Sequence, residues 1–167
     1  MNICIRLLAV GIVLIAMSAC ARDSSPDDQS REGAPQAAQG SQVVVVHKTP
    51  WCGCCTAWAE QARAAGFAVD LRDTDDLGAI KQALGVPPHQ ASCHTAEVEG
   101  YFVEGHVPFD DIRRLLAERP RARGIAVPGM PLGSPGMEAD VRHAYTVNLI
   151  GEDGSVIEYS RHPGDSR

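Results

Sequence analysis

The stretch VVVVHKTPWCGCCTAWAEQARAAG, residues 43–66, starts with a run of four valines and ends in a helical pattern. A continuous β-branched run is typical of a strand that is buried on both faces of a sheet. Farther along, Trp58, Ala62 and Ala65 recur at helical spacing, and Gly66 is a favourable helix stop. The stretch therefore predicts a buried strand, a turn that contains three cysteines, and a helix that begins at Cys55.

The pattern beyond this stretch predicts further strands and helices. The expected elements are a strand over 67–73, a helix over 77–84, two strands within 95–105, a helix over 107–120 and a hairpin over 145–160 that turns at Asp153 and Gly154. The Gly- and Pro-rich stretch 124–137 is expected to be a loop.

This order of elements predicts an α/β domain with a central mixed sheet and flanking helices. The cysteine motif lies at the first strand-to-helix turn of a βαβ opening. Such an arrangement resembles the thioredoxin superfamily, and the resemblance implies a thioredoxin-like fold.

Residues that precede the expected domain resemble an export signal and a tether. Residues 1–19 contain an apolar run over 7–17, which is shorter than the roughly 20 residues that span a bilayer. The ending MSAC resembles a bacterial lipoprotein signal, so Cys20 is expected to be lipidated; ordinary signal cleavage is the alternative. The polar residues 20–42 are expected to be a disordered tether. Residues 43–167 then form the domain, anchored on the periplasmic side of a membrane, with the outer membrane as the default.

The charge of the chain argues against a nucleic-acid partner. The sequence has 15 Lys and Arg against 21 Asp and Glu, which gives a net charge of -6. Binding to phosphates needs clustered basic residues, and an acidic chain without a basic block is a poor candidate for it.

The cysteines of the expected domain fall in two places. Cys52, Cys54 and Cys55 lie within four residues at the turn, and Cys93 lies just before a later expected strand. Free backbone N–H groups at a helix N-terminus stabilise thiolates. Because the ends of neighbouring elements meet in a compact βαβ fold, Cys93 is expected to face the turn.

Other soft side chains accompany the four thiols. His94 follows Cys93, His106 begins a later helix, and Met130 and Met137 lie in the Gly- and Pro-rich loop, so these are candidate secondary ligands or groups that orient the ligands. Soft sulfur ligands select Cu(I), Zn(II) or iron–sulfur clusters. A C-x-C-C run is too tight for all three side chains to reach one tetrahedral ion easily, whereas adjacent thiolates suit bridging between several Cu(I) ions. We therefore favour copper over zinc.

Four motifs, CGCC, SCHT, GYFVEGHVP and AVPGMPLGSPGM, are together similar to the CopG-like family of bacterial exported proteins. The similarity extends from about Val43 to Met137. It implies a thioredoxin-like fold, a role in periplasmic copper resistance by sequestration, transfer or copper redox, and a cysteine-bridged site for several Cu(I) ions. Copper export proteins or copper chaperones would be the partners. Matched by position, the ligands would be Cys52, Cys54, Cys55 and Cys93.

Two other interpretations of the cysteines stay open, and with them the question of whether the protein is an enzyme. Cys52 and Cys55 form a C-x-x-C pair that suits a periplasmic thiol–disulfide oxidoreductase, although Cys54 would compete as a partner. Structural disulfides are the second interpretation, but pairs within the cluster close very small loops and so stabilise little. A Cys52–Cys55 disulfide is compatible with a metal-free state of the copper site.

Overall fold

The computed structural model describes residues 42–165, which form an α/β fold as predicted. The expected signal peptide, Cys20 and all of the expected tether except residue 42 lie outside the described residues. The elements are β1 (Val43–Lys48), α1 (Gly53–Ala64), β2 (Ala68–Asp73), α2 (Leu77–Leu84), the 3-10 helix η1 (Pro88–Gln90), β3 (His94–Val98), β4 (Tyr101–Glu104), α3 (Phe109–Glu118), β5 (Ala122–Ala126), β6 (Tyr145–Gly151) and β7 (Val156–His162).

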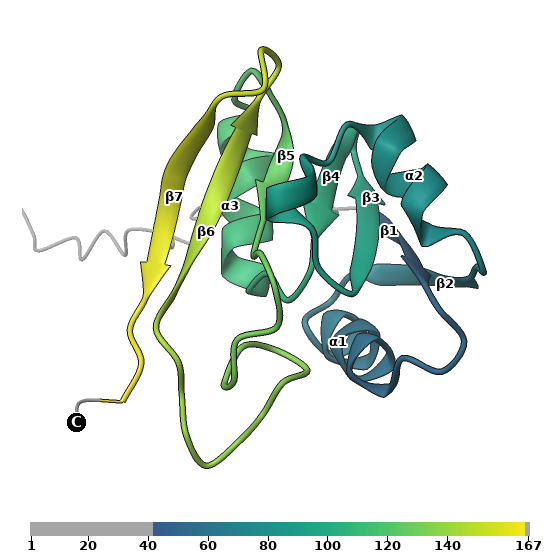
Figure 1. Ribbon diagram of the computed structural model, residues 1–167, viewed down its shortest axis with the longest axis vertical. Coiled ribbons are helices and arrows are strands. Elements are labelled where there is room, and N and C mark those ends of the chain that lie inside the picture. The colour runs from purple at the N-terminus through teal and green to yellow at the C-terminus, as the bar shows by residue number, and fades with distance from the viewer. Residues whose placement is uncertain (1–41, 166–167) are drawn as a thin grey trace, which may run out of the picture. The chain divides into compact units, whose positions relative to one another are not determined.

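One mixed sheet joins all seven of these strands in the order β2-β1-β3-β4-β5-β6-β7 (Figure 1). β1 is parallel to β2, and β4 is parallel to β5. The remaining neighbours are antiparallel. The predicted central mixed sheet with flanking helices is therefore confirmed.

The valine run forms β1, which lies between β2 and β3. Val44 and Val46 are fully buried on the face that packs against α1 (Gly53–Ala64) and α3 (Phe109–Glu118), whereas Val43 is 55% exposed. The prediction that the run is buried on both faces is wrong at Val43, because the second face of β1 is covered only toward its other end, where His47 is buried.

Helices cover both faces of the sheet. α1 and α3 share one face, where the rings of Trp58 and Phe109 lie 5.4 Å apart within the main apolar core. On the opposite face, Val86, which follows α2, packs with Phe102 and Ile150. Within residues 42–165, no helix is long and apolar enough to cross a membrane.

α1 begins at Gly53, two residues before the predicted start, with Cys52 as its N-cap. The early start has a chemical consequence, because Cys54 and Cys55 belong to the first turn of the helix. Their side chains therefore lie among the backbone N–H groups that have no partner within the helix.

β5 corrects the expectation that residues 124–137 form a loop throughout. Its residues Gly124, Ile125 and Ala126 pair in parallel with β4, opposite Phe102, Val103 and Glu104. Gly124 allows this close approach, because a Cβ atom there would overlap the backbone of Phe102.

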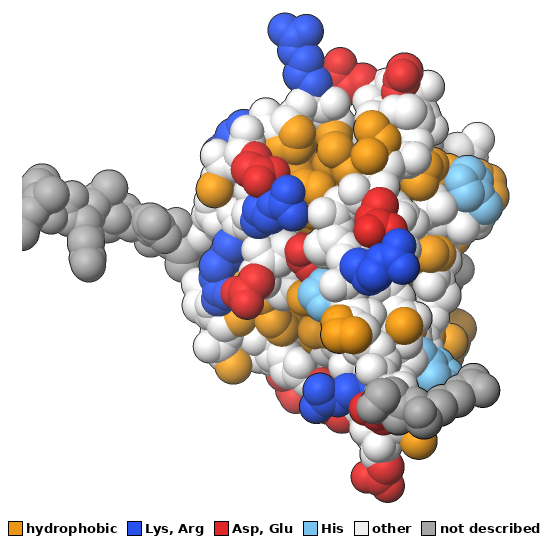
Figure 2. Space-filling model, turned by 90° about the vertical axis from the view of Figure 1, so that its left-hand side faces the viewer, with side chains coloured by type: hydrophobic (Ala, Val, Ile, Leu, Met, Phe, Trp, Pro, Cys, Tyr) orange, Lys and Arg blue, Asp and Glu red, His pale blue; other side chains and the backbone are white. Residues whose placement is uncertain are grey.

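The C-terminal hairpin of β6 and β7 turns at Asp153 and Gly154, as predicted. Gly154 has a φ of +83°, which suits a glycine. The face that Figure 2 shows mixes Lys and Arg with Asp and Glu side chains, so that neither charge dominates it. β7 lies at one edge of the sheet and leaves Ile157 57% exposed.

Candidate metal centre

Two separate segments bring the cysteines of the folded part together. Lys48, at the end of β1, pairs with His94, at the start of β3. Because the two strands are antiparallel, the turn that follows β1 meets the loop that precedes β3. The structure thereby confirms that Cys93 faces the cysteine turn.

The ligand atoms of the four cysteines lie within 4.8 Å of one another; the residues are Cys52, Cys54, Cys55 and Cys93. Cys54 is the central member, with its Sγ 3.4 Å from the Sγ of Cys52 and 3.9 Å from the Sγ of Cys93. The Sγ of Cys55 lies 3.5 Å from the carbonyl oxygen of Cys93. Two segments about 40 residues apart in the chain thus supply one sulfur cluster.

Cys52 and Cys55 are joined by a disulfide bond. This is the pair whose disulfide we expect to be compatible with a metal-free state of the copper site. Cys54 and Cys93 are free thiols. In this oxidation state only two of the four sulfur atoms can become thiolates. The structure therefore describes the cluster in an oxidised form.

The first turn of α1 favours negative charge at the cluster. It contains no acidic side chain, and the N-cap Cys52 makes no side-chain hydrogen bond to the helix. The turn before it is held by a backbone hydrogen bond of 3.1 Å from the Cys52 N–H to the Thr49 carbonyl. Unpaired N–H groups and the helix dipole stabilise thiolates placed here.

His106 faces Cys93 through a defined ring nitrogen. Its Nδ1 lies 2.8 Å from the carbonyl oxygen of Pro135, so Nδ1 carries the proton and donates a hydrogen bond to that oxygen. The lone pair of Nε2 then points to the Sγ of Cys93, 3.0 Å away. Burial lowers the pKa of His106 and keeps the ring neutral, which is the form that binds metals.

His94 is fully buried beside the same thiol, and its Nδ1 lies 3.5 Å from the Sγ of Cys93. Its ring packs on Trp58 at 4.8 Å and meets the ring of His106 edge-on at 5.0 Å. Burial, followed by repulsion from His106 and Lys81, lowers the pKa of His94 well below its usual value. Its Nε2 is buried without a hydrogen-bond partner among the described residues.

The thiol of Cys93 is protonated at neutral pH. Burial, followed by the influence of the neighbouring Cys54, raises the pKa of its thiol to about 12. A metal that binds here must displace that proton, so binding and ionisation are linked.

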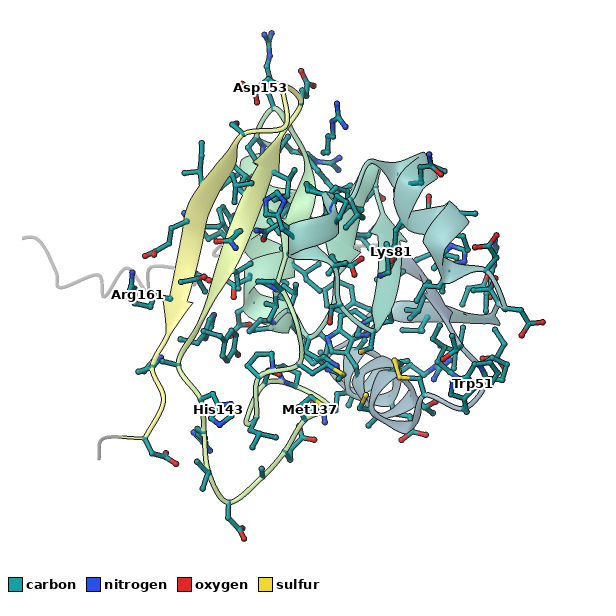
Figure 3. The ribbon with its side chains drawn as sticks, in the orientation of Figure 1. Trp51, Lys81, Met137, His143, Asp153 and Arg161 are labelled. Atoms are coloured by element: carbon teal, nitrogen blue, oxygen red, sulfur yellow. A yellow bond between two sulfur atoms is a disulfide. The ribbon has the colours of Figure 1, made fainter. Side chains whose placement is uncertain are left out.

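The cluster lies where solvent can reach it. Cys54 and Cys93 are partly exposed, while Cys55 is fully buried. Figure 3 shows the disulfide at α1, with Trp51 and Met137 on opposite sides of the helix in this view. Trp51 is 77% exposed, so its ring lies mainly in solvent.

The Gly- and Pro-rich segment after β5 packs against the cysteine turn. A Cβ atom on Gly136 would lie 2.7 Å from the Cys54 carbonyl oxygen and 2.8 Å from the Trp58 amide nitrogen. Of the two methionines, Met130 is 52% exposed and Met137 is partly buried. The segment thus approaches the cluster through its backbone.

Two contributors to the site escape the sequence analysis. Pro135 acts through its carbonyl group, and no side-chain pattern marks such a role. Glu104 is fully buried and accepts a hydrogen bond from the amide of Ser92, next to Cys93. A single acid among the apolar residues of YFVEGHV is a signal that could have identified it.

Residues 90–137, which contain Cys93, His94 and His106, match the family described as protein of unknown function DUF411. Among curated proteins the comparison finds no match. Two solved structures carry the name copper resistance protein CopG. Form 2 is 44% identical with a TM-score of 0.71, and Form 1 is 45% identical with a TM-score of 0.70. Each comparison covers 73% of this chain and 98% of the solved chain. At this identity over nearly the full length of its solved relatives, the chain belongs to the CopG-like family of copper resistance proteins.

Proposed function

We propose that this protein binds copper for copper resistance and that the reduced site holds several Cu(I) ions. The ligands are the four clustered cysteines, Cys52, Cys54, Cys55 and Cys93. The observation that carries this proposal is the approach of four sulfur atoms from two segments to within 4.8 Å of one another. The names of the solved relatives support copper as the metal.

The sulfur positions support metal binding in detail. A metal–thiolate bond is about 2.3 Å long for zinc, so two sulfur atoms 3.9 Å apart, as in Cys54 and Cys93, can bind one ion. Cys54 also lies next to Cys52, which suits a thiolate that bridges two ions. Thiolates prefer soft metal ions, and Cu(I) accepts the low coordination numbers that closely spaced cysteines impose.

Full loading requires reduction of the Cys52–Cys55 disulfide. A dithiol reductant supplies two electrons and two protons, which open the S–S bond to two thiols while the reductant itself becomes a disulfide. Copper then displaces the thiol protons. The helix N-terminus stabilises the thiolates that result.

His106 and His94 serve as secondary ligands or as groups that orient Cys93. The neutral Nε2 of His106 points at the thiol that a metal would bind. The unpartnered Nε2 of His94 is a further buried acceptor. Met130 and Met137 are candidates for transfer of copper, because thioether sulfur is a soft ligand.

A thiol–disulfide oxidoreductase is the second candidate function, supported by the disulfide in a C-x-x-C pair at a helix N-terminus. We also propose that the domain over residues 43–167 is thioredoxin-like, with residues 43–118 as the part that carries the likeness. The order β2-β1-β3-β4, with β1 parallel to β2 and antiparallel to β3, supports this assignment. The rest of the sheet extends it on the β4 side.

We retain the location and partners that the sequence predicts as proposals. Lipidation at Cys20 would anchor the protein on the periplasmic side of a bacterial membrane. Copper export proteins or copper chaperones would exchange copper with it there. The partly exposed thiols of Cys54 and Cys93 support exchange with another protein, since a donor can reach them.

Anaerobic titration of the reduced protein with Cu(I) and with Zn(II) tests the copper assignment. We expect the wild-type chain to bind several Cu(I) ions cooperatively. Cys93→Ser should lose this cooperative binding, because it removes the thiol that the second segment contributes to the cluster. One zinc ion per chain without cooperative copper binding would indicate a mononuclear site. Absence of tight binding of both metals, together with disulfide reduction by the metal-free protein, would favour the oxidoreductase.

A further inference from the structure

A fully buried carboxylate, that of Glu104 at the end of β4, lies behind the loop that contains Cys93. One oxygen accepts a hydrogen bond of 2.5 Å from the backbone N–H of Ser92 and pairs with the Lys81 ammonium of α2. The other oxygen accepts a hydrogen bond of 2.7 Å from the Thr95 hydroxyl, which accepts one from Lys81. Both carboxylate oxygens are thus engaged.

The loop over residues 91–93 belongs to neither a helix nor a strand and depends on such contacts for its course. The Ser92 hydroxyl donates to the carbonyl of Gly129, whose own N–H donates to the carbonyl of Ala91 at 3.1 Å. The bond from the Ser92 amide to Glu104 is charge-assisted, and such bonds are about twice as strong as neutral ones. Glu104 is therefore a strong fixed point for this loop.

Three consecutive residues at the end of β4 face the same loop. Glu104 binds the amide of Ser92. Gly105, with a φ of +72°, leaves room for that serine, since a Cβ atom there would lie 2.5 Å from the Ser92 Cβ. His106 then approaches the Sγ of Cys93. Glu104 thus lies on the segment that also places an imidazole beside the thiol.

A role in stability alone does not account for this pair of charges. Replacement of a buried ion pair by apolar residues of similar volume is often neutral or stabilising, because desolvation costs offset the attraction. The bond from Glu104 to the Ser92 amide is a feature that such apolar residues would lack. In metal sites, groups that orient the ligands typically change metal affinity by 10–100-fold when they are lost.

We propose that Glu104 is a positioning residue, which fixes Cys93 as a copper ligand by holding the amide of Ser92; this inference rests on the proposed copper function. Lys81 of α2 pairs with the carboxylate of Glu104. Within residues 42–165, the carboxylate of Glu104 bonds to Lys81, Ser92 and Thr95 and to no sulfur atom, so its effect on copper is transmitted through the loop.

The test compares three variants of the full chain. Lys81→Met with Glu104→Met removes both charges and the acceptor for Ser92 without leaving an unpaired buried charge. Glu104→Gln keeps a neutral acceptor of the same shape. Thr95→Val is the matched control, because it removes a bond to the other carboxylate oxygen and leaves the Ser92 bond intact.

Three readouts separate positioning from folding: thermal stability, hydrogen exchange of the Ser92 amide without metal, and Cu(I) affinity with the copper–thiolate absorption band. In the double variant we expect wild-type stability, rapid exchange at Ser92, an altered band and copper affinity about 10–100-fold weaker. We expect a smaller loss in Glu104→Gln and none in Thr95→Val.

Wild-type copper affinity and spectrum in a folded double variant would overturn the positioning role. If the double variant does not fold, Glu104→Gln decides, and an unchanged copper affinity and Ser92 exchange rate would overturn it equally. Failure of the copper function itself gives a different result, because wild type and Cys93→Ser would then bind copper alike. The Ser92 exchange rates would still report on the loop.

Discussion

Cys93 is the residue at which the two segments of the site meet. Its thiol lies 3.9 Å from the Sγ of Cys54 and 3.0 Å from the Nε2 of His106. The proton of the thiol and the lone pair of the neutral imidazole are complementary, so the metal-free site is stable without ionisation. Copper that binds here, as we propose, would replace this proton, and the metal–sulfur bond would offset the cost of ionisation.

The raised pKa of Cys93 predicts an unreactive thiol in the disulfide form. With a pKa of about 12, roughly one thiol in a thousand is ionised at pH 9, where an ordinary thiol is about half ionised. We expect iodoacetamide to alkylate Cys93 far more slowly than in the unfolded chain at pH 9, as measured by mass spectrometry. Cys54→Ser should speed the reaction only in part, because burial is the larger cause.

The raised pKa of Cys93 also makes the stability of the folded protein depend on pH. The folded state holds the Cys93 proton at pH values where the unfolded chain has released it, so metal-free protein loses stability between about pH 9 and pH 12. Below pH 9 the contribution is fully present. Equal alkylation rates in the folded and unfolded protein would contradict both statements.

At the scale of elements, most of the architecture could be predicted because apolar spacing is local. The helix over Leu77–Leu84 and the turn at Asp153 both follow from short patterns. β5 could not be predicted, because Arg123 and Gly124 break its strand pattern and its pairing with β4 is a tertiary effect. The start of α1 at Gly53 also lies before the predicted one, because cysteines are poor markers of a helix.

The segment over residues 128–137 is an element in its own right, since it places the Pro135 carbonyl against His106. Gly136→Ala should push this segment away from α1, because its Cβ atom would overlap the Cys54 carbonyl. Beyond the cost of a left-handed φ, we expect a loss of about 1–3 kcal/mol in the free energy of unfolding, measured by urea titration.

Gly129→Ala is the matched control for that experiment. Gly129 lies in the same segment with a similar φ of +71°, but a Cβ atom there meets nothing within 4 Å. Its substitution carries the backbone cost alone, roughly 1–2 kcal/mol. Losses of equal size in the two variants would show that the segment does not pack tightly on α1.

At the scale of the whole molecule, the sequence could identify the cysteines of the cluster but not the framework that holds them. The place of Cys93 just before an expected strand of a compact βαβ fold was sufficient to predict that it faces the cysteine turn. The bonds from Glu104 to Ser92 and from Pro135 to His106 depend on contacts between distant segments, 12 and 29 residues apart. The residue pattern within a short stretch of sequence does not predict such contacts.

Because Cys52 and Cys55 form a disulfide, we predict that the redox state of the protein determines how many copper ions it binds. Oxidised protein offers only Cys54 and Cys93, which suffice for about one soft ion, whereas reduction adds the two thiols of Cys52 and Cys55. We expect Cu(I) titration to give several ions per chain after reduction and about one ion before it.

A variant with both Cys52→Ser and Cys55→Ser isolates the disulfide as the cause. It cannot form the bond, so its copper stoichiometry should match that of oxidised wild type and should not change with reduction. Equal stoichiometry in oxidised and reduced wild type would mean that copper does not need the disulfide sulfurs. The four-cysteine site would then be reduced to the pair Cys54 and Cys93, and Cys52 with Cys55 would be left for disulfide exchange.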